Sequence, residues 1–202
     1  MPPCASLPKR ASPSRATLTG LDIHLPRKDQ WTASGGWGPF PDVYDPSFKA
    51  TLVKEVAQHK GKAVGDPWCL GYFLGNELTW GRDEAWLASA VLKSPADQPA
   101  KKVLVDDLQK KYEKIDNLNK AWNADHASWD ALLRSTAAPD ASRARADLAA
   151  FLDKTADAYF RQCREAVKDI DPEGLYLGCR FAGWANTRIF LAAARYSDVI
   201  SV

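Results

Sequence analysis

The chain has few residues of the kinds that build metal or disulfide sites. Its 202 residues include three histidines and four cysteines, and no two cysteines form a C-x-x-C pair. Zinc sites made of thiolates use such closely spaced pairs, so we expect no zinc site and no cofactor. Cys69 and Cys179 fall in apolar stretches, where a free thiol packs as a small hydrophobic group. The cysteines therefore leave the cellular compartment open.

Long apolar runs and a strong charge imbalance are also missing. The 27 basic and 25 acidic residues give a net charge of +2, and no segment approaches the roughly 20 apolar residues of a membrane span. A balanced charge gives no indication of binding to nucleic acid or to an anionic membrane. We expect neither partner, and the oligomeric state stays open.

The N-terminal segment lacks the apolar core of a secretory signal. Its content of Pro, Ser and Arg predicts a flexible lead-in over residues 1–18. No other part of the chain has the composition of a linker, so residues 19–202 are interpreted as one domain.

The most informative stretch is residues 66–81, where an apolar run over 68–74 leads directly into Asn76 and Glu77. The run has no polar residue to face water, which is typical of a strand buried on both faces of a parallel sheet. In α/β barrels the catalytic groups lie at the carboxyl ends of such strands. A carboxylate in that position, with Trp80 close by, indicates sugar chemistry.

The remaining pattern alternates helices with short apolar strands. Two further strands are predicted at 175–181 and 198–202, and a weaker one at 19–25. Helices are expected at 46–59, 86–92, 101–112, 115–122, 129–133, 144–169 and 187–196. The alternating charges of 101–114 predict a solvated helix face. The order of elements predicts parallel strands in an α/β fold. With only three firm strands, we expect a partial (β/α)8 barrel with a helical insert over 82–143.

Residues 71–81 resemble the acid/base strand of the clan A retaining glycoside hydrolases. The closest likeness is to the β-agarases of family fifty and the β-galactosidases of family forty-two. Segments 40–46, 111–129 and 176–202 are similar to the flanking blocks, so the resemblance covers about residues 37–202. It implies that the chain holds about strands three or four to six of a barrel. The nucleophilic glutamate of the family belongs to strand seven, so the resemblance implies a fragment that is inactive alone.

Retaining hydrolysis uses two carboxyl groups about 5–5.5 Å apart across the glycosidic bond. Glu77 is our candidate for the acid/base. A proton donor has to keep its proton near neutral pH, which favours apolar surroundings such as Tyr72, Phe73 and Trp80. The resemblance implies that Asn76 contacts the 2-hydroxyl of the sugar. The structural alternative is that Asn76 and Glu77 form an ordinary polar end of a strand before a turn.

Three more side chains are candidates for substrate binding. Trp80 and Trp184 offer flat apolar faces on which a pyranose ring can stack, although for any single tryptophan a role as a core or loop anchor is the favoured interpretation. Arg180 ends the predicted strand 175–181, where it would bind substrate hydroxyls or form a structural salt bridge.

The sequence predicts a retaining hydrolase, or a piece of one, that acts on galactose-containing poly- or oligosaccharides. One alternative is a carbohydrate-binding remnant that lacks turnover. The other is a helix-rich interaction protein in which the Asn76-Glu77 pair is incidental. The resemblance is compatible with secreted or periplasmic full-length homologues, but it does not decide the compartment.

Overall fold

Three parallel strands form the central sheet of the computed structural model, which describes residues 19–23, 30–31, 40–66, 68–181 and 185–200. The sheet order is β1 (Thr19–Ile23), β4 (Cys69–Leu74) and β5 (Leu175–Tyr176). Helical connections link these strands along the chain, which is the arrangement that parallel neighbours require. The α/β character and the parallel pairing predicted from the sequence are thus confirmed. The weakly predicted strand at 19–25 is present over 19–23, and residues 24 and 25 lie outside the described residues.

A second, two-stranded sheet joins β2 (Gln30–Trp31) and β3 (Phe40–Pro41) in antiparallel pairing. Helix α1 (Pro46–Ala57) follows, and it begins at the residue where the sequence predicts a helix to start. Asp45 caps it by accepting a hydrogen bond from the Ser47 amide at 2.8 Å, and Pro46 occupies the first turn. The apolar stripe of Phe48, Leu52 and Val56 is buried in the core, as its helical spacing predicts.

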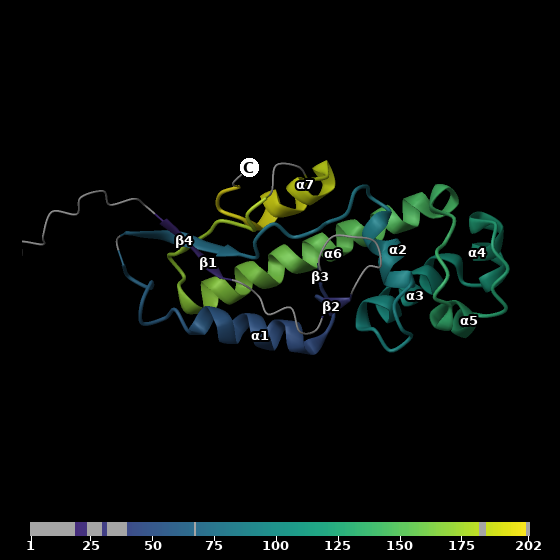
Figure 1. The fold of residues 1–202 in the computed structure, drawn as a ribbon, viewed down its shortest axis with the longest axis horizontal. Coiled ribbons are helices and arrows are strands. Elements are labelled where there is room, and N and C mark those ends of the chain that lie inside the picture. Colours follow the sequence, from purple (N-terminus) through teal and green to yellow (C-terminus); the bar gives the residue numbers. More distant parts are fainter. Residues whose placement is uncertain (1–18, 24–29, 32–39, 67, 182–184, 201–202) are drawn as a thin grey trace, which may run out of the picture.

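The longest element is α6 (Ala141–Ile170), a 30-residue helix about 45 Å long by its rise per residue. Figure 1 shows α6 in green through the centre of the molecule, with α1 on one side and α7 (Thr187–Tyr196) on the other. Both α1 and α7 pack against α6, which also contacts α2 and β5. The buried face of α6 therefore supplies much of the core beneath the sheet, including Tyr159 and Phe160.

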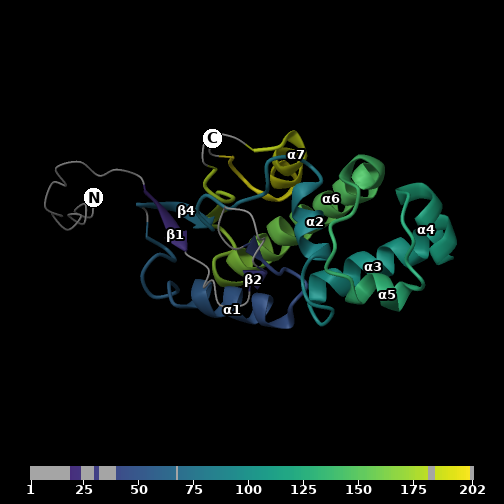
Figure 2. The same cartoon turned by 45° about the vertical axis from the view of Figure 1, so that its right-hand side comes forward.

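Four shorter helices separate β4 from α6 in the sequence. They are α2 (Trp86–Leu92), α3 (Pro99–Tyr112), α4 (Ile115–Trp122) and α5 (Trp129–Arg134). Figures 1 and 2 show α3, α4 and α5 gathered at one end of the molecule, far from β1 and β4. The charge-rich α3 is not solvated throughout, because Lys101 is buried and donates to the carbonyls of Ser94 at 2.6 Å and Ser135 at 2.7 Å.

Two buried carboxylates attach these helices to the rest of the chain. Asp42, which follows β3, accepts hydrogen bonds from the Ala100 amide at 3.0 Å and from the side chain of Gln98. Asp147 on α6 accepts from Lys111 Nζ, Tyr112 Oη and Trp122 Nε1. Every one of those five donors belongs to the helical segment between Gly81 and α6, and both acceptors lie outside it.

Three strand predictions need correction. Residues 68–74 are not covered on both faces throughout, because Trp68 and Leu70 are exposed at the start of β4. The strand predicted over 175–181 is regular only at Leu175–Tyr176, since Gly178 adopts a left-handed φ of 76° and interrupts it. Residues 198–200 are not a strand, while 201 and 202 lie outside the described residues.

The bend at Asp198 has a physical reason. Its amide donates to the Tyr176 carbonyl at 2.8 Å, as a neighbouring strand would, but its carboxylate accepts from the Tyr176 amide at 2.9 Å. The side chain thus takes the place of a backbone carbonyl, so the chain need not continue alongside β5. None of the helices in the described part of the chain is long and apolar enough to cross a bilayer.

Candidate active site

The site predicted from the sequence lies just past the carboxyl end of β4, where the backbone makes an abrupt turn. Gly75 follows Leu74 with a φ of 83°, a conformation that glycine adopts without strain. A Cβ atom at this position would also lie only 2.5 Å from Tyr159 Oη. Position 75 therefore requires glycine for two independent reasons, backbone conformation and space.

The segment that follows β5 continues to pair with β4 and with the residues after it. The Leu177 amide donates to the Tyr72 carbonyl at 2.9 Å, and the Leu74 amide donates to the Gly178 carbonyl at 3.0 Å. Further along, the Arg180 amide donates to the Gly75 carbonyl at 3.1 Å, and the Glu77 amide donates to the Arg180 carbonyl at 2.9 Å. Pairing between the two segments thus extends through Glu77, and Asn76 and Arg180 form a parallel bridge.

Because the Arg180 amide donates to the Gly75 carbonyl, no backbone hydrogen bond from the described part of the paired segment reaches the Leu74 carbonyl. Tyr159, fully buried on α6, donates its hydroxyl hydrogen to this carbonyl at 2.6 Å. Burial raises the pKa of the Tyr159 phenol well above its usual value, so the hydroxyl stays protonated and remains a donor. A side chain of α6 therefore completes the hydrogen bonding of the strand end.

Glu77 is exposed and has a φ of 51°, in the left-handed region that few residues other than glycine adopt. Strained backbone of this kind persists only where the surroundings hold it, and it often occurs at functional positions. The apolar enclosure expected for Glu77 is wrong for the described residues. Tyr72 is buried and its hydroxyl donates to Asp171, while Trp80 belongs to the core.

Asn76 and Arg180 lie beside Glu77 in the backbone pairing, so the structure brings these three predicted residues together. Asn76 is half-buried, and its Oδ1 atom is buried without a hydrogen-bond partner among the described residues. A buried acceptor of that kind has unused capacity for a hydroxyl donor. Arg180 is exposed, which leaves its guanidinium within reach of solvent.

The expectation that Trp80 stacks on sugar is not met by the structure. Only 5% of the residue is exposed, and its indole stacks on Phe160 with ring centroids 5.5 Å apart. Phe40 and Tyr159 contact the same indole edge-on, at 4.6 and 5.5 Å. The correction has a simple cause, since the loop after Glu77 folds back onto α6 and buries the ring. Trp184 lies outside the described residues.

Tyr159 is the residue of this region that the sequence analysis did not single out for function. The spacing of the apolar residues along α6 predicts a buried helix face that includes Tyr159. That spacing cannot show which carbonyl the buried hydroxyl reaches. Trp80 and the tyrosine lie 79 positions apart in the sequence, so only the fold reveals that they touch.

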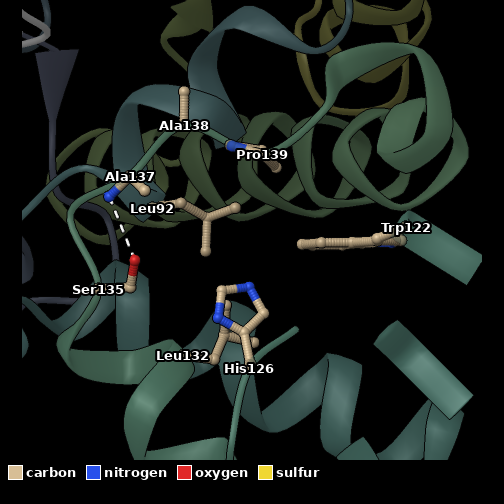
Figure 3. A pocket seen from close by; sticks show the side chains of 8 residues that line it. All are labelled: Leu92, Trp122, His126, Leu132, Ser135, Ala137, Ala138 and Pro139. Carbon is tan, nitrogen blue, oxygen red and sulfur yellow. Dashed lines mark hydrogen bonds between the residues drawn. The ribbon is translucent and has the colours of Figure 1, made fainter. Parts of the chain in front are cut away.

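Figure 3 shows a different hollow, lined by residues of α2, α4 and α5 and of the segments that follow α4 and α5. Leu92 points toward its centre, near the ring of Trp122 and the imidazole of His126. Its volume of about 30 Å³ is that of roughly one water molecule, far below the size of a sugar ring. The described residues also contain no group of three or more His, Cys, Asp or Glu side chains arranged to hold a metal.

Comparison with known proteins agrees with the resemblance inferred from the sequence. Over 181 residues the chain is 32% identical to β-agarase B of Vibrio sp. (strain JT0107). The aligned region is 84% of this chain and 19% of that protein. The crystal structure of the agarase AgWH50C superposes with a TM-score of 0.81 at 34% identity, over 89% of this chain and 27% of the other. The chain is a relative of the β-agarases.

This glycoside hydrolase relative also shares its fold with more distant enzymes. A β-galactosidase from the Antarctic haloarchaeon Halorubrum lacusprofundi matches with a TM-score of 0.58 over 85% of this chain and 26% of that one. At 16% identity, this likeness shows the fold alone. The neighbours are (β/α)8-barrel enzymes, and the chain corresponds to a helix-rich α/β portion of such proteins. No family model matches the chain.

The chain spans about a fifth of the length of the curated agarase that it matches and about a quarter of the solved one. The resemblance to agarases inferred from residues 71–81 is therefore confirmed at the level of relationship. The roles of individual residues remain predictions.

Proposed function

We propose that the chain supplies the proton-donor part of a retaining glycoside hydrolase that acts on galactose-containing poly- or oligosaccharides. The observation that carries the proposal is the position of Glu77. It lies exposed, three residues past the end of a parallel strand, in a left-handed backbone conformation that neighbouring segments hold. The relationship to β-agarases supports the substrate class.

In this proposal Glu77 protonates the glycosidic oxygen as the bond to the leaving sugar breaks. It then removes a proton from the water that releases the remaining sugar. Retaining chemistry also needs a second carboxyl group about 5–5.5 Å away as the nucleophile. We assign this group to a barrel strand that the 202 residues do not include, which makes the chain inactive alone.

The other predicted residues take substrate-binding roles. Asn76 Oδ1, which lacks a partner among the described residues, would accept a hydrogen bond from a sugar hydroxyl. Arg180 would bind hydroxyls from the paired segment beside it, and Trp184 keeps its proposed stacking role. No cofactor takes part.

The same proposal extends to the fold. We assign β1, β4 and β5 to consecutive parallel strands of a (β/α)8 barrel, with residues 82–143 as an insert and residues 1–18 as a lead-in. Support comes from the sheet order and from the helices α1, α6 and α7, which pack together beside it.

A carbohydrate-binding remnant is the second candidate, and one observation favours it. Glu77 is exposed among the described residues, whereas a general acid is better served by apolar surroundings that keep it protonated. A site with this geometry can bind a glycan through Asn76 and Arg180 without cleaving it.

One experiment separates the candidates. Hydrolysis and binding of agar oligosaccharides would be measured for a length-completed protein that includes the nucleophile strand, as the wild type, as Glu77→Gln and as Glu113→Gln. The 202-residue chain alone is expected to show no turnover. The second variant is a matched control, because Glu113 is also an exposed glutamate with a left-handed φ, of 62°. An enzyme predicts turnover that falls roughly 10²–10⁴-fold in Glu77→Gln and is unchanged in Glu113→Gln.

Aryl β-galactosides with an activated leaving group add a second readout. Such a group departs without protonation, so the loss in Glu77→Gln should be much smaller on this substrate than on oligosaccharides. Binding without turnover in all three length-completed proteins would support the remnant. The absence of both binding and turnover would contradict both candidates and leave the helix-rich interaction protein.

A further inference from the structure

Glu77 lies in the middle of an arch formed by residues 74–80, and both ends of this arch rest on one side chain of α6. At the first end, Tyr159 Oη donates to the Leu74 carbonyl at 2.6 Å. At the second end, the Trp80 indole contacts the Tyr159 ring edge-on, with centroids 5.5 Å apart and planes at 87°.

The middle of the arch is held less firmly than its ends. The Glu77 amide donates to the Arg180 carbonyl, and the Gly75 carbonyl accepts from the Arg180 amide. Both bonds depend on the segment after Gly178, where regular pairing has already been interrupted. A left-handed conformation is strained for a residue other than glycine, so Glu77 needs further support from its surroundings.

Tyr159 is placed to give this support. It is fully buried, it lies between Phe40, Phe48, Trp80 and Phe160, and its hydroxyl fits against Gly75, where no Cβ atom could stand. A ring fixed on four sides has little rotational freedom, so its hydroxyl is a rigid donor. The bond to Leu74 also sets where the strand stops and where the turn through Gly75 starts.

We propose that Tyr159 is a positioning residue that holds Glu77 in its left-handed conformation by fixing both ends of the 74–80 arch. The inference rests on the proposed function for its catalytic meaning, since it makes the tyrosine the support of the proton donor. The conformational claim itself does not depend on any sugar being hydrolysed.

The variant that isolates the hydroxyl is Tyr159→Phe, which keeps the ring and its aromatic contacts. Tyr176→Phe is the matched control, because Tyr176 is equally buried, lies on β5, and has a hydroxyl without a hydrogen-bond partner among the described residues. Both substitutions remove one buried oxygen atom, and only one of them removes the bond to β4.

The measurement is solution NMR of the wild-type chain and the two variants. The Cα chemical shift and the amide–Hα coupling of Glu77 report its φ, and amide exchange reports the Glu77 hydrogen bond to Arg180. We expect Tyr159→Phe to shift Glu77 away from the left-handed values and to speed exchange of its amide at least tenfold. In Tyr176→Phe these signals should match the wild type.

Unchanged Glu77 signals in Tyr159→Phe would overturn the inference, as would equal changes in both variants, which would indicate a general loosening of the core. Hydrolysis adds an independent arm. In the length-completed protein, Tyr159→Phe should lower kcat for agar oligosaccharides by roughly 10–100-fold with KM within twofold, because it displaces the proton donor and not the substrate contacts. Failure of the proposed function appears as an unaffected Glu77→Gln, and failure of this inference appears as unaffected Glu77 signals.

Discussion

Asp198 bonds to both backbone groups of Tyr176. Its amide donates to the Tyr176 carbonyl at 2.8 Å, and its carboxylate accepts from the Tyr176 amide at 2.9 Å. The same carboxylate pairs with Arg164 at 2.9 Å and Lys168 at 3.1 Å. Partial burial acts to raise the pKa of Asp198, but the Tyr176 amide and the two cations outweigh it and lower the pKa to about 2.

This pKa predicts acid sensitivity at the edge of β5. A carboxyl with a depressed folded-state pKa stabilises the fold above its unfolded value, near 3.8, and loses that contribution as the pH falls toward 2. We expect Asp198→Asn to lower the free energy of unfolding by about 1 kcal/mol at pH 7, after allowing for solvent screening. The difference from the wild type should shrink as the pH falls from about 4 to 2 and vanish below pH 2.

Urea titrations at several pH values would check this prediction. Asp130→Asn is the control, because Asp130 forms an exposed pair with Arg134 within one helix. A pH-independent difference for Asp198→Asn would show that the carboxylate charge is not what stabilises this edge.

Asp147 predicts a larger loss, since its side chain is only 6% exposed and accepts hydrogen bonds from Lys111, Tyr112 and Trp122. Asp147→Asn replaces one acceptor oxygen by a donor that faces other donors. We expect a loss of about 2–3 kcal/mol in the free energy of unfolding, measured by urea denaturation. Asp107→Asn, which breaks the more exposed pair with Lys154, should cost at most about 1 kcal/mol. Equal effects of the two variants would contradict this account.

Gly75→Ala tests the turn that leads to Glu77. The alanine would have to adopt a φ of 83° and place its Cβ atom 2.5 Å from Tyr159 Oη, so we expect a loss of about 2–4 kcal/mol. Gly61→Ala is the control, because no atom lies within 4 Å of its Cβ position and its φ is outside the left-handed region. Its thermal unfolding should change little or move slightly upward. A tolerated Gly75→Ala would mean that the turn is not fixed as described.

Trp80→Leu separates a core role from a sugar-binding role. Loss of the buried indole against Phe40, Tyr159 and Phe160 should cost about 3–5 kcal/mol of stability. Trp68→Leu, at an indole that is 45% exposed, should change stability by less than about 1 kcal/mol. A Trp80 variant that keeps its stability but loses affinity for agar oligosaccharides would restore the stacking interpretation.

Local signals in the sequence were sufficient for most of the fold. The helices α4 and α7 have the predicted bounds, because caps, turns and apolar spacing all act within a few residues of the chain. The strands were harder, since β5 is cut short by the left-handed Gly178 and the 198–200 segment pairs through a side chain. Neither effect has a periodic signature.

The candidate site was likewise predicted only in part from local signals in the sequence. The strand-end position of Asn76 and Glu77 followed from an apolar run that leads into polar residues, which is a local pattern. The burial of Trp80 depends on α6, whose contacting residues come almost 80 positions later. A tryptophan beside a predicted acid therefore gives the same sequence signal whether it faces a ligand or the core.

The carboxylates of Asp42 and Asp147 bear on how this architecture can be altered. All their partners from outside their own neighbourhood lie in the segment between Gly81 and α6. Replacing that segment by a short turn would leave Asp147 with none of these three donors and Asp42 with only the Tyr44 amide, at 2.9 Å. Buried carboxylates that lose their donors cost several kcal/mol of stability. The helical segment between Gly81 and α6 therefore cannot be deleted on its own. A shortened homologue would have to exchange Asp42 and Asp147 for apolar residues at the same time.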